Sequence, residues 1–111
     1  MLPLVSVIMP VYNGGKFLEQ SINSVLCQSY SNLELLIVND GSTDNTQAII
    51  ERFTDDRIRF FSQKNKGVSA ARNLALSHMK GNFFCMLDSD DVFTVNSIES
   101  RMKIFDRSPA I

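Results

Sequence analysis

The feature that most constrains the fold of this chain is a regular alternation of short apolar runs with segments of helical period. Four runs are at least half apolar, at residues 4–10, 33–40, 58–63 and 82–88. The segment Lys16–Gln28 instead places apolar side chains three or four residues apart, on one face of a helix: Leu18, Ile22, Val25 and Leu26. The pattern predicts a βαβαβαβα chain.

Three further helices follow the second, third and fourth apolar runs. We expect Ser42 or Thr43 to cap the second helix, and Lys80 and Gly81 to end the third helix, which lies within 67–81. Apolar stripes mark the second and fourth helices, and consist of Thr46, Ile49, Ile50 and Phe53, and of Ile98, Met102 and Phe105.

Strands with nearly continuous apolar character are typical of a parallel sheet covered by helices on both faces. Right-handed crossovers limit the topology, and we expect strand order 3-2-1-4 with a switch point between the first and fourth strands. Ligands of open α/β sheets bind beyond the carboxyl ends of the strands at such a point. The loops selected by this rule are Pro10–Asn13 and Asp88–Asp91, with Asp40 at the end of the neighbouring strand.

Composition limits the classes of protein. The length of 111 residues corresponds to one domain. A net charge of −1 gives no electrostatic case for nucleic acid, and no apolar run approaches the roughly 20 residues of a membrane span. We expect Cys27 and Cys85 to be buried free thiols, since they form neither a CxxC pair nor a disulfide framework. Free thiols fit a reducing, cytoplasmic compartment.

The acidic run Asp88–Asp91 follows a buried strand at the predicted switch point. Like charges this close repel, so the carboxylates either point apart into water or surround a positive group. Asp88 and Asp90 suit Mg²⁺ or Mn²⁺, which take one or two carboxylates and complete their shell with water and phosphate. The alternative is a solvated loop that caps a helix beginning near Thr94. The segment Asn13–Lys16 is no Walker loop and no GxGxxG is present, so diphosphate recognition would depend on the metal and on backbone groups.

Four motifs in this order make a more specific pattern: VSVIMPVYNGGKFLEQSINSVLCQSY, LELLIVNDGSTDNT, GVSAARNLAL and MLDSDD. Together they resemble the nucleotide-sugar-binding half of a family 2 glycosyltransferase with the GT-A fold. The resemblance covers Leu4 to about Arg107.

The resemblance implies roles for the first two loops. Pro10, Val11, Tyr12 and Asn13 would cradle the base and ribose of the donor, with Tyr12 packed on uracil. Asp40 would accept a hydrogen bond from the pyrimidine N3–H. The alternatives are a half-buried loop aromatic for Tyr12 and a turn aspartate for Asp40.

Roles at the acidic loop follow from the same resemblance. Asp88 and Ser89 would lie along the ribose and diphosphate, Asp90 would be the direct ligand of the metal with Asp88 beside it, and Asp91 would orient the loop. Arg72 would approach the nucleotide, or lie as a plain arginine on the helix surface.

The family transfers a sugar, typically a hexose, with inversion from a nucleotide-diphosphate donor to an acceptor hydroxyl of a glycan, lipid-linked or other molecule, as in polysaccharide biosynthesis. A divalent ion stabilises the leaving diphosphate. The general base and acceptor pocket are expected beyond Ile111. Residues 1–111 would then be the donor-binding part of a longer enzyme, inactive alone, in the cytoplasm or at the inner face of the membrane through the missing part.

Two other classes of protein are alternatives. A non-catalytic, regulatory nucleotide-binding domain would use the same residues without transfer. A phosphoacceptor receiver domain would need acidic residues after the first strand, where the chain has PVYNGG.

Overall fold

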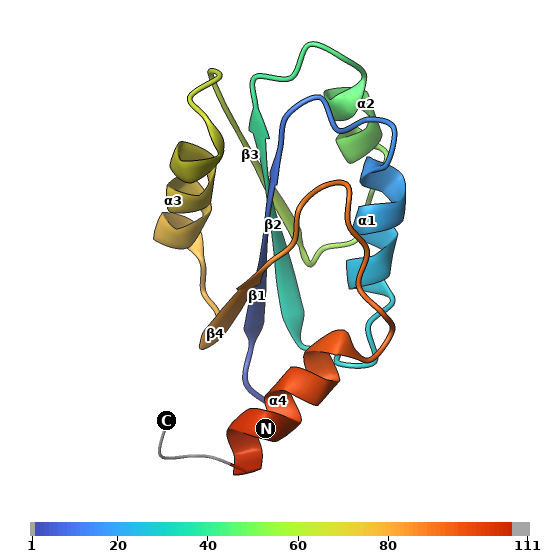
Figure 1. Cartoon of the computed structure of the whole chain (residues 1–111), viewed down its shortest axis with the longest axis vertical. Helices are drawn as coiled ribbons and strands as arrows, with labels where there is room; N and C mark the ends of the chain where they lie inside the picture. Colours follow the sequence, from blue (N-terminus) through green and yellow to red (C-terminus); the bar gives the residue numbers. More distant parts are fainter. Residues whose placement is uncertain (1, 108–111) are drawn as a thin grey trace.

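The computed structural model describes residues 2–107, in which strands and helices alternate along the chain (Figure 1). The strands are β1 (Val5–Val11), β2 (Leu33–Asp40), β3 (Ile58–Gln63) and β4 (Phe83–Met86). The helices are α1 (Leu18–Leu26), α2 (Thr46–Glu51), α3 (Val68–His78) and α4 (Ser97–Arg107). The strands form one parallel sheet of order β3-β2-β1-β4. The predicted α/β class, the strand order and the switch between β1 and β4 are therefore confirmed.

Helices cover both faces of the sheet, as the apolar runs predicted. Alternate residues of β1 point to opposite faces, so Met9 packs with α1, α2 and α4 while Ile8 packs against Ala71 and Ala75 of α3. Every residue of β1 and β2 is buried. The two central strands therefore need apolar side chains on both faces, which explains their nearly continuous apolar sequence.

The ends of two helices differ from the sequence expectations because the residues involved have other partners. Ser42 and Thr43 do not cap α2, since both bond to Asn13 in the preceding loop. Helix α3 ends at His78 and the chain is already extended at Met79, so Lys80 lies outside the last turn and Gly81 is not a C-cap. A Cβ on Gly81 would meet the Ser6 hydroxyl at 2.4 Å, and a glycine is needed there for this close approach.

The cysteines also differ in part from expectation. Cys27 is exposed at the end of α1, so the expectation of two buried thiols is wrong for this residue. Cys85 is partly buried in β4, and burial raises the pKa of its thiol. The expected contacts of Phe105 lie outside the described side chains. Of the helices in the described part of the chain, none has the length and apolar character to cross a membrane.

Candidate functional site: a cleft at the carboxyl ends of β1, β2 and β4

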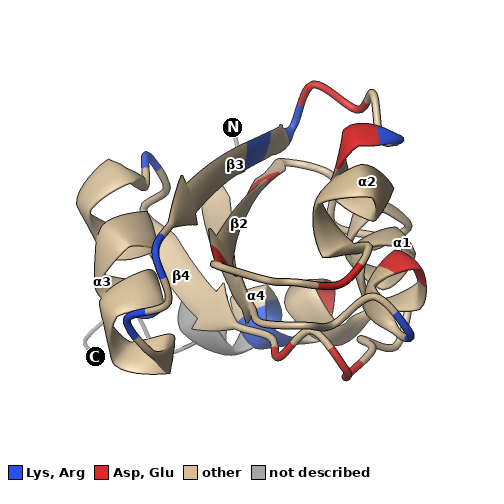
Figure 2. Cartoon of the chain, turned by 90° about the horizontal axis from the view of Figure 1, so that it is seen from above, with Lys and Arg blue, Asp and Glu red and all other residues tan. Residues whose placement is uncertain are grey.

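A cleft of about 590 Å³ opens beyond the carboxyl ends of strands β1, β2 and β4. Viewed onto this end of the sheet, acidic positions are spread along the loops (Figure 2). The cleft collects all but one of the donor-binding and metal-binding residues that the sequence predicted: Pro10, Val11, Tyr12, Asn13, Asp40, Asp88, Ser89 and Asp90. The exception is Arg72, which lines a neighbouring cavity. Residues up to 80 positions apart thus meet here because parallel strands end at one edge.

Asp40 is buried in the wall of the cleft, with 4% of its surface exposed. Its Oδ1 accepts hydrogen bonds from the Gln63 amide at 2.8 Å and the Lys66 N–H at 2.7 Å, and its Oδ2 accepts one from the Gly67 N–H at 3.0 Å. Burial by itself would raise the pKa of Asp40, but the bonds from Lys66, Gln63 and Gly67 outweigh it, and the pKa is lowered. The carboxylate therefore joins the end of β2 to the start of α3 and keeps one acceptor position on Oδ2.

Asn13 connects the loop after β1 to the loop after β2. It has a φ of 51°, in the left-handed region, which asparagine tolerates better than most residues. Its N–H donates to the Ser42 hydroxyl at 2.9 Å, and its side-chain oxygen accepts from the N–H groups of Thr43 at 2.7 Å and Asp44 at 3.3 Å. The Asn13 amide oxygen is thus occupied by protein donors, although the residue lines the cleft.

Two glycines extend this connection. The Gly14 N–H donates to the Thr46 hydroxyl at 3.1 Å, and the Gly15 N–H donates to the Asp44 carboxylate at 3.1 Å. A Cβ on Gly14 would meet the Ser89 hydroxyl at 2.8 Å, and one on Gly15 would meet the Asn45 side-chain oxygen at 2.0 Å. The loop after β1 therefore touches both the loop after β2 and the acidic loop.

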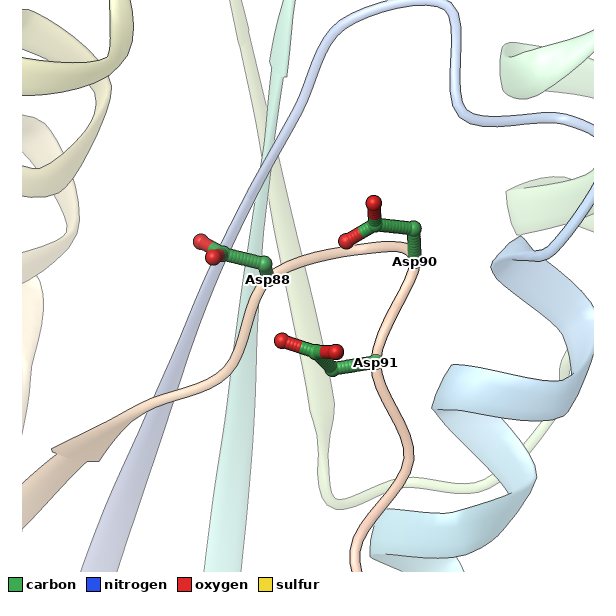
Figure 3. Close-up of side chains that lie close together, drawn as sticks. All are labelled: Asp88, Asp90 and Asp91. Carbon is green, nitrogen blue, oxygen red and sulfur yellow. The ribbon is translucent and has the colours of Figure 1, made fainter.

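The acidic loop presents three exposed carboxylates: Asp88, Asp90 and Asp91. One carboxylate oxygen of each residue lies within 4.8 Å of one oxygen of each of the other two. The Asp90 and Asp91 side chains point across the turn toward Asp88 (Figure 3). Among the residues that the structure describes, none donates a hydrogen bond to these side chains. The Asp91 N–H donates to the Asp88 carbonyl at 3.0 Å, which closes the turn. Such a set of free carboxylate oxygens is what Mg²⁺ or Mn²⁺ prefers.

Arg72 approaches the acidic loop from α3. Its guanidinium lies 3.7 Å from an Asp88 oxygen, while its Nε is buried without a hydrogen-bond partner. The side chain is 38% exposed, so Arg72 is neither a plain surface residue nor a wall of the main cleft. It supplies positive charge behind Asp88.

Sequence reasoning missed several residues of the site. Gly14, Lys16, Phe17 and Val68 also line the cleft. The signal that could have indicated Lys16 is its position just after β1, although the segment Asn13–Lys16 is no Walker loop. The polar face of α1 is a further part of the site that apolar periodicity does not reveal.

Comparison with known proteins identifies the family. Residues 6–111 match the family described as "Glycosyl transferase family 2". A protein of Rickettsia typhi named as an uncharacterized glycosyltransferase is 41% identical over 105 residues, which cover 95% of this chain and 33% of that protein. Glycosyltransferase GlyG of Streptococcus pneumoniae is 43% identical over 103 residues, covering 90% of this chain and 34% of GlyG. The chain belongs to glycosyl transferase family 2, and it spans about a third of the length of these relatives.

Solved structures agree with this assignment. TarS of S. aureus, residues 1–349 in complex with UDP-GlcNAc, superposes with a TM-score of 0.88 at 26% identity, over 97% of this chain and 32% of that chain. The mannosyltransferase PcManGT of Pyrobaculum calidifontis, in complex with GDP-Man and Mn²⁺, gives a TM-score of 0.78 at 28% identity, over 84% of this chain and 29% of that chain. The GT-A fold expected from the sequence motifs is confirmed.

Proposed function

We propose that the cleft binds the nucleotide diphosphate of a sugar donor, with UDP as the nucleotide, together with a divalent cation. The observation that carries this proposal is the meeting of two sets of residues in one cleft. One set, Tyr12 and Asp40, suits a base, and the other, Asp88 and Asp90, suits a metal–diphosphate unit. The complexes of TarS with UDP and UDP-GlcNAc support the choice of nucleotide.

Tyr12 and Asp40 have properties that fit the base of the donor. Tyr12 is 51% exposed and offers a ring face at the cleft, and an aromatic ring stacks on any base. The free acceptor position on the Asp40 carboxylate can take the N3–H of uracil. Cytosine presents an acceptor at that position, so Asp40 would favour UDP over CDP.

The donor set of the acidic loop fits Mg²⁺ or Mn²⁺, because all three side chains offer oxygen and no described residue donates a hydrogen bond to them, with the Arg72 guanidinium 3.7 Å from Asp88. Asp90 would be the direct ligand, with Asp88 beside it. The bound ion would supply Lewis-acid stabilisation of the diphosphate as the glycosidic bond breaks. The Mn²⁺ in the PcManGT complex supports this choice of cofactor.

The transfer that we propose is inverting. An acceptor hydroxyl on a glycan, lipid-linked or other molecule attacks the anomeric carbon while the nucleotide diphosphate leaves from the opposite side. A general base takes the proton of that hydroxyl. We assign this base to none of the described residues, and propose that residues 1–111 are the donor-binding part and bind the donor without transferring the sugar.

Calorimetric titration with UDP tests the metal-dependent donor site. The protein containing this chain is titrated in Mn²⁺ and again in EDTA, and so are the variants Asp90→Ala and Asp56→Ala. Asp56 is an exposed carboxylate before β3, at the opposite edge of the sheet, and serves as the matched control. We expect tight binding in Mn²⁺, at least tenfold weaker binding in EDTA, and loss of the difference in Asp90→Ala only.

Two outcomes would overturn parts of the proposal. Equal affinity in Mn²⁺ and EDTA would exclude the metal, and an absence of UDP binding in both would exclude the nucleotide site. Binding without turnover by the complete protein, assayed with UDP-sugars and a hydroxyl acceptor, would favour a regulatory nucleotide-binding domain.

A further inference from the structure

One face of α1 carries three polar side chains that bond to the segment from the acidic loop to the start of α4. These residues are Ser21, Ser24 and Gln28, where Gln28 lies just after the C-cap residue Cys27. Their spacing of three and four residues places them in one row along the helix. Their partners are all backbone groups, so the row holds the path of the segment whatever its side chains are.

Ser21 lies closest to the carboxylates. Its hydroxyl is within hydrogen-bond distance of the carbonyl oxygens of Ser89, at 2.7 Å, and of Asp91. These two carbonyls belong to the residues on either side of Asp90. Ser21 is fully buried, so water cannot replace its bond if the hydroxyl is removed.

The other two residues hold the segment further along. The Ser24 hydroxyl accepts the N–H of Phe93 at 3.0 Å. The Gln28 amide donates to the Thr94 carbonyl at 2.7 Å and accepts the N–H of Ile98 at 3.0 Å. Gln28 is also buried, with 6% exposed. The attachment therefore runs from the acidic turn to the first turn of α4.

This attachment leaves the carboxylates free while it fixes the chain that carries them. Three like charges within 4.8 Å repel one another, and an unattached loop would relax by moving them apart. A metal would then have to draw them together again, which lowers affinity by the cost of ordering the loop. The single Ser21 hydroxyl proton can go to the Ser89 or the Asp91 carbonyl, so the hydroxyl holds the backbone beside Asp90 and part of that ordering cost is met during folding.

We propose that Ser21 is a positioning residue for the metal–diphosphate half of the site. It acts through the backbone of Ser89 and Asp91 and touches neither metal nor donor. This inference rests on the proposed function, because it takes the acidic loop to be the metal site. Residues that orient metal ligands in this indirect way typically change affinity by 10- to 100-fold when mutated.

The test compares two ligands on one set of variants of the protein that contains this chain. UDP in Mn²⁺ uses both halves of the cleft, whereas uridine lacks the diphosphate and uses only the base side. Titrations, by calorimetry for UDP and by NMR for uridine, are made with wild type, Ser21→Ala, Ser24→Ala and Asn23→Ala. Asn23 is exposed on another face of α1 and is the matched control.

We expect Ser21→Ala to weaken Mn²⁺-dependent UDP binding about tenfold and to leave uridine affinity unchanged. Ser24→Ala should weaken UDP binding less, because its partner lies beyond Asp91, and Asn23→Ala should match wild type. If Ser21→Ala does not fold, the UDP and uridine affinities of Ser24→Ala alone decide the outcome. A thermal melt of each variant in EDTA, without ligand, shows whether that variant folds.

Equal loss of UDP and uridine binding would overturn the proposal, since it would indicate a general structural role for the row. Unchanged UDP binding in both serine variants would also overturn it. If wild-type UDP binding is itself independent of Mn²⁺, the proposed function fails first, and the positioning role of Ser21 fails with it.

Discussion

Asp40 and Asp90 are aspartates at the same edge of the sheet, and both line the same cleft, yet their surroundings are opposite. Asp40 is buried and receives three protein hydrogen bonds, whereas Asp90 is exposed and receives none from the described residues. A buried carboxylate must be paired with donors, and its loss leaves them unsatisfied. An exposed carboxylate beside other carboxylates is repelled by them, and therefore does not stabilise the fold unless a cation is bound. The comparison distinguishes Asp40, which stabilises the wall of the cleft, from Asp90, whose oxygens are available to a ligand.

The largest expected effect is on stability. Asp40→Asn keeps the shape of the side chain but turns one of the two acceptor oxygens into a donor, which then faces either the Lys66 N–H or the Gly67 N–H. We expect the free energy of unfolding to fall by about 2–3 kcal/mol, measured by chemical denaturation in EDTA. The matched variant Asp90→Asn should leave it unchanged or raise it, because one repelling charge is removed. An equal loss in both variants would refute the distinction between them.

A smaller effect is expected from ligand binding. UDP with Mn²⁺ at ten times the dissociation constant should stabilise the wild type by about 1.4 kcal/mol, since it binds only the folded state. This stabilisation should fall to about 0.4 kcal/mol or less in Asp90→Asn at the same ligand concentration, since binding there is expected to be about tenfold weaker. Thermal melting with and without Mn²⁺ and UDP measures it, with Asp56→Asn as the control. A full stabilisation of Asp90→Asn would show that this carboxylate is not a metal ligand.

The smallest effect is on the pH dependence of stability. Because the pKa of Asp40 is lower in the folded state than the value of about 3.9 in an unfolded chain, its contribution is complete above about pH 4 and is lost as the pH falls through the folded-state pKa. The difference in unfolding free energy between wild type and Asp40→Asn should therefore be constant from pH 7 to about 5 and narrow below about 4. Denaturation at several pH values checks this, and a difference that widens with acid would contradict it.

Much of the fold was predictable because the apolar pattern reflects burial directly. The second and third strands have the bounds of their apolar runs, 33–40 and 58–63. Helix ends were less predictable, because they depend on contacts between segments distant in sequence. Ser42 is a good capping residue by type, but its hydroxyl is taken by Asn13, some 30 residues earlier. Local propensity carries no information about such a partner.

The candidate site also has a part that the sequence predicts and a part that depends on contacts between distant segments. The topological rule selected the three loops, and the cleft contains nearly all of the residues named on them. It could not identify Ser21, whose role depends on a contact across 68 residues. The polar row Ser21, Ser24 and Gln28 was visible in the sequence as polar residues at helical spacing, and this is the signal that could have indicated a second packed face of α1.

The close approach of Gly14 and Gly15 to their neighbours has a mechanical consequence. At Gly14 an added Cβ would collide with Ser89 of the acidic loop, and at Gly15 with Asn45 of the loop after β2. At these two positions the corner has no room for a side chain, so the loop after β1 lies against both neighbouring loops. Replacing either glycine by alanine would therefore force a neighbouring loop to move, the acidic loop at Gly14 and the loop after β2 at Gly15.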